Sequence, residues 1–113
     1  MRRDDILLLD MLLAAREAVE FAEGLTFETF QRDRMAQLAI LKAVEIVGEA
    51  ASRVGVDSRN EHPEIPWTAI VGMRNRLVHE YSNVNLARVW EAVMRDIPRL
   101  IPQLESLVPP ETG

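Results

Sequence analysis

Apolar residues recur at helical spacing along most of the chain, and no stretch alternates apolar and polar residues over the length of a typical strand. The first such segment runs from about Asp4 to Glu23, where Asp4 or Asp5 can cap the helix and Gly24 can end it. Its apolar residues cover a wide arc, which predicts packing partners on two sides. They are Ile6, Leu7, Leu8, Leu9, Met11, Leu12, Leu13, Val19 and Phe21.

The second segment begins after Thr26, a suitable N-cap, and extends to about Val54, just before Gly55. A break is predicted near Arg32–Asp33, which would separate a short helix from a long one. One face of the long helix carries mostly small apolar residues, so another helix can approach it closely. These residues are Ala36, Ile40, Ala43, Val44, Val47, Ala50, Ala51 and Val54.

A polar connection over residues 55–66 contains two prolines and leads into the third helix, from Trp67 to about His79 or Tyr81. Pro66 is expected at the first position of this helix, where the missing N–H costs nothing. The third helix is followed by a short polar stretch that ends at Asn85.

Asn85 can cap the fourth helix, and Pro98 must kink or restart it because proline lacks an N–H and clashes with the preceding turn. The apolar stripe of this helix comprises Leu86, Val89, Trp90, Val93, Ile97, Leu100, Ile101, Leu104 and Leu107. The pattern therefore predicts an all-α antiparallel bundle of four long helices, or five if the short piece forms separately. Residues 1–108 would form one domain, and residues 109–113 a frayed tail.

Composition narrows the functional classes. The 113 residues include no cysteine, which excludes a disulfide framework, a thiolate metal site and a cysteine nucleophile. The formal net charge of −5 argues against general DNA binding, since such binding depends on phosphate neutralisation. Any contact with nucleic acid must therefore use a local basic site.

The N-terminus resembles a signal peptide only in part. Arg2 and Arg3 precede an apolar run, but Asp4, Asp5 and Asp10 interrupt it and no small-residue cleavage site follows. No window approaches the roughly 20 apolar residues that a membrane span needs. We expect a soluble, cytoplasmic protein.

The stretch "MRNRLVHEYSN", residues 73–83, contains the most unusual side chains. At about 100° per residue, Arg74 falls in the centre of the third helix's apolar stripe, which is costly unless the arginine is paired or faces a cleft. Arg76 points the opposite way, whereas Asn75 and His79 share the flank with Gly72. About 140° separate Arg74 from His79. The long arginine side chain, fraying of the helix or a second copy of the helix from another subunit could close that gap.

These residue types suit cleavage of a phosphodiester in RNA, in which a 2′-hydroxyl attacks the adjacent phosphorus. Histidine can accept and donate a proton near neutral pH. Arginine presents a forked, permanently charged donor set to phosphate oxygens. Such a site needs no metal and no cofactor, and the histidines with their acidic neighbours form too small a ligand set for a metal.

Structural roles explain the same residues as well. Arg74 could pair with Glu45 or Glu49 of the second segment. His79 at a helix end could complement the helix dipole, and Tyr81 on an apolar stripe is typical of a core residue with its hydroxyl at the rim. From the residues alone, both interpretations stay open.

The stretch "RNRLVHEY" resembles the motif of the HepT-like toxins in the HEPN superfamily of small all-helical ribonucleases: an arginine, four to six residues, a histidine, any residue and a tyrosine. The resemblance covers nearly the whole chain. "AILKAVEIVGEAASRV" is similar to that family's second long helix, and residues 65–104 are similar to its motif helix and last helix.

The resemblance implies that Arg74 and His79 are the catalytic pair of a metal-independent endoribonuclease, supported by Asn75. It also implies a homodimer with the motif helices facing each other across a cleft, and a type VII-like toxin–antitoxin pair. The antitoxin would be an MntA-like minimal nucleotidyltransferase that silences the toxin by AMPylation of Tyr81. An alternative hypothesis is a non-catalytic helical dimer that binds nucleotide or docks a nucleotidyltransferase. A third is a helical scaffold without a site, in which an intrachain carboxylate closes off Arg74.

Overall fold

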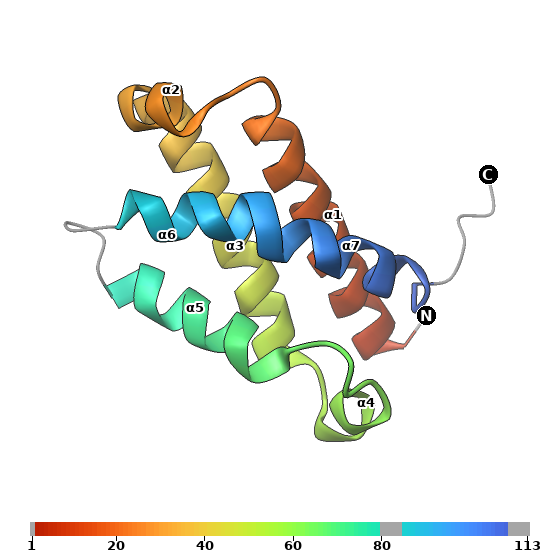
Figure 1. The fold of residues 1–113 in the computed structure, drawn as a ribbon. Coiled ribbons are helices and arrows are strands. Elements are labelled where there is room, and N and C mark those ends of the chain that lie inside the picture. Colours follow the sequence, from red (N-terminus) through yellow and green to blue (C-terminus); the bar gives the residue numbers. More distant parts are fainter. Residues whose placement is uncertain (1, 80–84, 109–113) are drawn as a thin grey trace.

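The fold is seen in a computed structural model, which describes residues 2–79 and 85–108, and the side chains of these residues except 76–79. All secondary structure within these residues is helical, which confirms the predicted all-α class. The helix α3 lies centrally and packs against α1 and α5, while α6, η2 and α7 run in succession across the bundle (Figure 1). The elements are α1 (Arg3–Ala22), α2 (Phe27–Arg32), α3 (Arg34–Arg53), α4 (Val56–Glu61), α5 (Trp67–His79), α6 (Leu86–Glu91), the π-helical turn η2 (Ala92–Asp96) and α7 (Ile97–Glu105).

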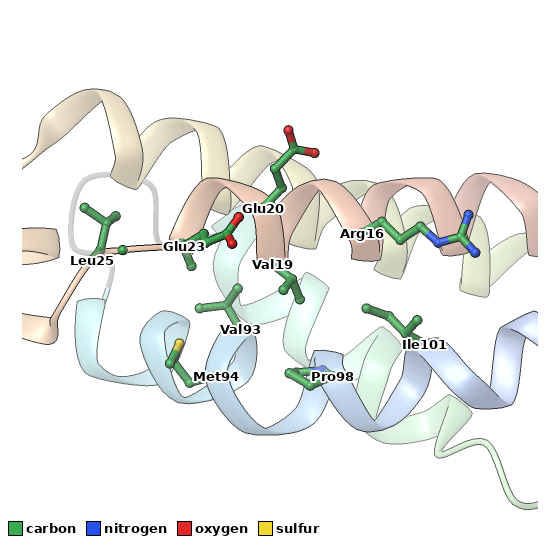
Figure 2. A pocket seen from close by; sticks show the side chains of 11 residues that line it. Arg16, Val19, Glu20, Glu23, Leu25, Val93, Met94, Pro98 and Ile101 are labelled. Atoms are coloured by element: carbon green, nitrogen blue, oxygen red, sulfur yellow. The ribbon is translucent and has the colours of Figure 1, made fainter.

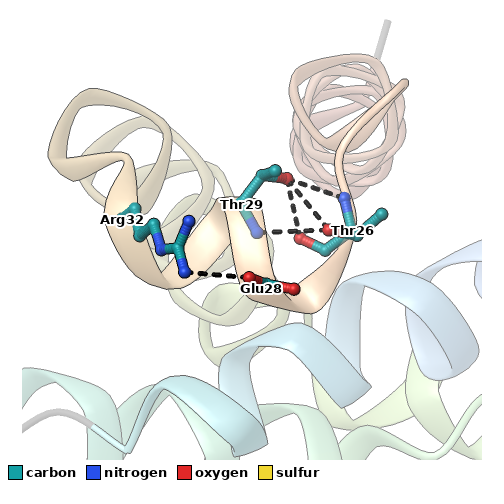
Figure 3. Close-up of polar contacts among 4 residues, drawn as sticks. All are labelled: Thr26, Glu28, Thr29 and Arg32. Atoms are coloured by element: carbon teal, nitrogen blue, oxygen red, sulfur yellow. Dashed lines mark hydrogen bonds and ion pairs between the residues drawn. The ribbon is translucent and has the colours of Figure 1, made fainter.

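The predicted break within the second segment is confirmed and separates α2 from α3, and side-chain caps fix the start of each helix. The hydroxyl of Thr26 accepts the Thr29 N–H at 3.1 Å, and the hydroxyl of Thr29 accepts the Thr26 N–H at 2.8 Å (Figure 3). Asp33 then ends α2 and begins α3, because its carboxylate accepts the Ala36 N–H at 3.0 Å. These caps satisfy N–H groups that have no partner within the helix.

The predicted polar connection after Val54 contains a short helix that was not predicted, α4. The structure also gives Asp4 a role different from the predicted cap. Its carboxylate accepts hydrogen bonds from the Ser58 hydroxyl and from the Gly55 N–H, which tie the first turn of α1 to α4. Pro66 precedes α5 instead of occupying its first position, and its carbonyl accepts the Ile70 N–H at 3.0 Å.

The predicted disturbance at Pro98 takes the form of a π-helical turn. The Ile97 N–H bonds to the Ala92 carbonyl, five residues back, and α7 begins immediately afterwards with Pro98 in its first turn. The wider turn accommodates a residue that has no N–H to donate and whose ring would clash with an α-helical carbonyl. A second proline, Pro102, lies inside α7.

The core forms between α1, α3, α5 and the last helices. The wide apolar arc of α1 contacts α3 and, on its other side, α7 and η2, as its pattern predicts. Trp90 packs against Phe30 with ring centroids 5.1 Å apart, and the buried Trp67 donates its indole N–H to the His62 carbonyl at 2.9 Å. Both tryptophans therefore serve packing. None of the described helices combines the length and apolarity needed to cross a membrane.

Candidate functional site

The side chain of Arg74 leaves α5 where that helix crosses α3, directly over Gly48. A Cβ atom added to Gly48 would lie 2.1 Å from the Cβ of Arg74 and 2.7 Å from its Cγ. It would also lie 3.3 Å from the Ile70 carbonyl oxygen. The arginine stem thus occupies space that is open because residue 48 has no side chain.

Two acceptors hold the guanidinium of Arg74. Its Nη2 forms an ion pair with the Glu49 carboxylate, and its Nη1 donates to the Asn75 side-chain oxygen at 2.8 Å. The side chain of Arg74 keeps 30% of its surface exposed. A guanidinium carries five N–H donors, and the remaining donors of Arg74 have no hydrogen-bond partner among the described side chains, so they can bind a ligand such as phosphate. The structure brings the Asn75 side chain to Arg74, and its supporting role at a catalytic site stays a prediction.

Glu49 also binds a second arginine. Its other carboxylate oxygen accepts from Arg53 Nη2 at 3.0 Å, one helical turn further along α3. Two guanidinium groups therefore share one carboxylate, and the cluster Arg53–Glu49–Arg74 carries a net charge of +1 in a chain of net charge −5. The cluster is therefore a local basic site, the kind of site that an acidic protein would need for any contact with nucleic acid.

Of the two acidic partners that the sequence offered to Arg74, the structure selects Glu49. Glu45 lies one turn earlier on α3 and is buried, with 7% of its surface exposed. Its Oε1 has no hydrogen-bond partner among the described residues.

The other predicted site residues lie at or beyond the edge of the described structure. His79 is the last residue of α5, and its side chain is not among those described. Tyr81 falls outside the described residues. The proximity of these two side chains to Arg74 stays a prediction.

A separate shallow pocket of about 460 Å³ opens between the C-terminal part of α1 and the η2–α7 region (Figure 2). Apolar side chains line much of it, including Val19, Val93 and Ile101, with Glu20 and Glu23 among the polar ones. None of the predicted site residues lines this pocket. Among the side chains that the structure describes, no group of three or more histidine, aspartate or glutamate residues could hold a metal ion.

The roles of Gly48 and Arg53 were not predicted from the sequence. The spacing of Glu49 and Arg53, four residues apart on one helix, signals an ion pair but does not show that a third residue joins it. A glycine in a helix interior costs stability, so Gly48 indicated a close approach, but the sequence could not show which side chain fills it.

The chain is a small all-helical protein in which α5, the helix that carries Arg74, packs on the long central helix α3. Sequence comparison shows to which family of such proteins it belongs. The model of the family described as "Ribonuclease HepT-like" matches residues 11–107. The chain belongs to the HepT-like ribonuclease family, which confirms the predicted resemblance.

Individual relatives agree with this assignment. The chain is 39% identical over 102 residues to "Probable ribonuclease HepT" of Thermococcus cleftensis, which covers 87% of this chain and 93% of the relative. It is 36% identical over 93 residues to "Putative RNase TTE0752" of Caldanaerobacter subterraneus, which covers 82% of this chain and 83% of the relative. No solved structure matches the chain.

Proposed function

We propose that this protein is a metal-independent endoribonuclease that acts as the toxin of a toxin–antitoxin pair. The observation that carries the proposal is the state of Arg74, which is fixed by Glu49 and Asn75 yet partly exposed and left with further donors. Family membership supports RNA as the substrate. A permanently charged, oriented guanidinium can stabilise the negative charge that grows on phosphate during cleavage.

In the proposed reaction the ribose 2′-oxygen bonds to phosphorus as its proton passes to a base, and the bond from phosphorus to the 5′-oxygen breaks. The 5′-oxygen leaves with a proton, and the products are a 2′,3′-cyclic phosphate and a 5′-hydroxyl end. His79 is proposed to handle these protons because its ordinary pKa suits both directions of transfer. Arg74 is proposed to bind the non-bridging phosphate oxygens.

The proposed control is AMPylation of Tyr81 by an MntA-like nucleotidyltransferase antitoxin. Tyr81 follows His79 by two residues in the sequence. A nucleotide attached there would add a phosphate's negative charge and considerable volume beside the proposed catalytic pair, and would compete with RNA for Arg74.

The proposed active form is a homodimer. The outward face of α3 exposes three large apolar side chains, Met35 at 81%, Leu38 at 47% and Ile46 at 37%. Exposed apolar residues aligned on one helix face favour contact with a partner. Glu49 and Arg53 lie on the same side of α3. A second copy bound to this face would therefore place the cluster Arg53–Glu49–Arg74 at the edge of the dimer interface.

The experiment uses purified, unmodified protein and RNA in the presence of EDTA. We expect cleavage that leaves 2′,3′-cyclic phosphate or 3′-phosphate ends, and loss of cleavage by at least about 100-fold in Arg74→Ala and His79→Ala, in line with the contribution of a single acid–base or charge-stabilising group. Circular dichroism and light scattering check that both variants stay folded. Full activity in both variants would contradict the assignment of the site.

One observation favours the alternative functions. Arg74 is paired with an intrachain carboxylate, as a scaffold without a site predicts. A non-catalytic dimer that binds nucleotide or docks a nucleotidyltransferase would share this fold. Expression of the toxin alone separates the hypotheses, since a nuclease arrests growth and His79→Ala relieves the arrest, whereas a scaffold or docking subunit has no such effect.

A further inference from the structure

The described residues contain three glutamate–arginine pairs with a spacing of four residues but different surroundings, namely Glu28–Arg32, Glu49–Arg53 and Glu91–Arg95. Glu28 and Arg32 form an exposed pair at 2.8 Å on α2, with 72% and 76% of their side chains accessible (Figure 3). Glu49 and Arg53 form a similar pair at 3.0 Å on α3. Only the second pair is joined by another arginine among the described residues.

An exposed pair at this spacing contributes little to helix stability. Arg53 keeps 60% of its side-chain surface exposed, so stability alone gives little reason for its position. Arg95 offers a comparison, because this one cation contacts two carboxylates, those of Glu91 and Asp96. At Arg53 two cations share one anion, so the cluster keeps an excess positive charge.

The geometry of this cluster suits a chain of phosphates. The nitrogen atoms of Arg53 and Arg74 bind the two oxygens of one carboxylate, so the two guanidinium groups are separated by no more than the span of that carboxylate and its hydrogen bonds. Their remaining donors have no hydrogen-bond partner among the described side chains and can bind a polyanion. Arginine recognises phosphate through forked pairs of N–H groups, and RNA presents phosphates at regular intervals.

We propose that Arg53 is a second phosphate-binding residue, which contacts the RNA backbone beside the phosphate held by Arg74, and that Glu49 is the positioning residue that holds both arginines. This inference rests on the proposed ribonuclease function. Arg53 contributes affinity for RNA and not chemistry, because its phosphate is not the one that reacts. Glu49 acts through Arg74. Its carboxylate fixes the orientation of the Arg74 guanidinium, and its negative charge weakens the attraction of that guanidinium for anions.

The test measures binding of a 2′-O-methyl RNA oligonucleotide, which lacks the attacking hydroxyl, by fluorescence anisotropy over a series of salt concentrations. In Arg53→Ala we expect the Kd to rise about fivefold or more at low salt, and the slope of log Kd against log salt to fall by about 0.7, the value for one phosphate contact on a single strand. On cleavable RNA, KM should rise while kcat changes by less than about twofold.

Arg32→Ala is the matched control, since it breaks a glutamate–arginine pair of the same spacing that has no third partner among the described residues. It should leave both Kd and slope unchanged. If Arg53→Ala gives the same result as Arg32→Ala, the second phosphate contact is disproved, whereas inactivity of Arg74→Ala would still support the nuclease.

Glu49→Gln tests the positioning role, because it keeps the size of the side chain and removes its charge. We expect tighter RNA binding together with a kcat reduced about tenfold, since Arg74 gains attraction for phosphate but loses its fixed orientation. Glu49→Asp should recover part of the lost kcat. If Glu49→Gln changes the melting temperature but keeps the wild-type Kd and kcat, Glu49 serves only as a structural ion pair. That result would overturn its assigned positioning role.

Discussion

The first two side-chain carbons of Arg74 lie over the backbone of Gly48, so the residue proposed to bind phosphate is also part of the contact between α5 and α3. Helices approach this closely only where one of them lacks a side chain. The position of the guanidinium therefore depends on a residue that has no chemistry of its own.

Gly48→Ala should destabilise the protein. The new methyl group would stand 2.1 Å from the Arg74 Cβ, and the helix crossing would have to widen. Overpacking of this kind costs about 1–3 kcal/mol, which exceeds the gain of about 1 kcal/mol from replacing a helical glycine. The free energy of unfolding, measured with urea, should fall accordingly.

Gly72→Ala is the control for that measurement. Gly72 lies in α5, and a Cβ added there would meet nothing within 4 Å among the described residues. The substitution should leave stability unchanged or raise it by up to about 1 kcal/mol. Equal stability of the two variants would show that the contact between Gly48 and Arg74 is not tight.

The link between Asp4 and α4 should make stability depend on acid pH. The Ser58 hydroxyl, followed by the Gly55 N–H, lowers the pKa of Asp4 in the folded protein from its ordinary value of 3.8. The stabilisation is then complete above that ordinary value and is lost as the pH falls through the lower folded pKa. Asp4→Asn should be less stable than wild type at pH 6, and the difference should shrink below about pH 4.

Urea unfolding at several pH values checks this expectation. Asp10→Asn on the exposed face of the same helix is the control, because Asp10 makes no hydrogen bond or ion pair to another side chain among the described residues. A constant difference between wild type and Asp4→Asn from pH 6 to pH 3 would exclude the proposed linkage.

Leu38→Glu should disrupt the proposed dimer. Leu38 lies on the outward face of α3 with 47% of its surface exposed, so the charge should be tolerated by the monomer but not within an apolar seam. Light scattering should show a dimer for wild type and a monomer for the variant. Val56→Glu, at a residue 62% exposed on α4, should stay dimeric. A wild-type protein that is monomeric at micromolar concentration would refute the dimer.

Tyr81→Phe should block the proposed modification. After coexpression with the genomic neighbour that encodes the nucleotidyltransferase, the wild-type protein should gain one or more AMP units by intact mass. The phenylalanine variant should gain none, because it lacks the hydroxyl that accepts the nucleotide. AMP found on the variant would place the modification on another residue.

The sequence predicted the helices well because their caps and breakers are local signals. Thr26, Asp33 and Asn85 each accept a backbone N–H three residues on, so the pattern around each residue suffices to place it. Asp4 shows where such reasoning fails. Its type and position fit a cap, yet its hydrogen bonds go to residues more than 50 positions away.

The same difference between local and long-range contacts explains which features of the candidate site were predicted. Helical periodicity placed Arg74 on the packed face of α5, and its contact with Gly48 agrees with that placement. Periodicity placed Asn75 on the flank with His79, and did not predict its hydrogen bond to Arg74. Periodicity within one helix cannot show which residue of another helix comes opposite, so it offered both Glu45 and Glu49 as partners. Arg53 was overlooked because its part in the cluster depends on that same crossing.

The π-helical turn at Ala92–Asp96 sets the rotational phase of the chain's last helix. Val89, Val93 and Ile97 follow one another at intervals of four residues and are all buried, a spacing that would drift around a regular α-helix. The wider turn absorbs this drift and keeps α7 facing the bundle. A π turn holds one residue more than an α-helical turn, so removal of one residue here should restore regular pitch and leave α7 in phase, whereas an inserted residue should swing every later side chain by about 100°. This segment should therefore tolerate a single-residue deletion better than a single-residue insertion.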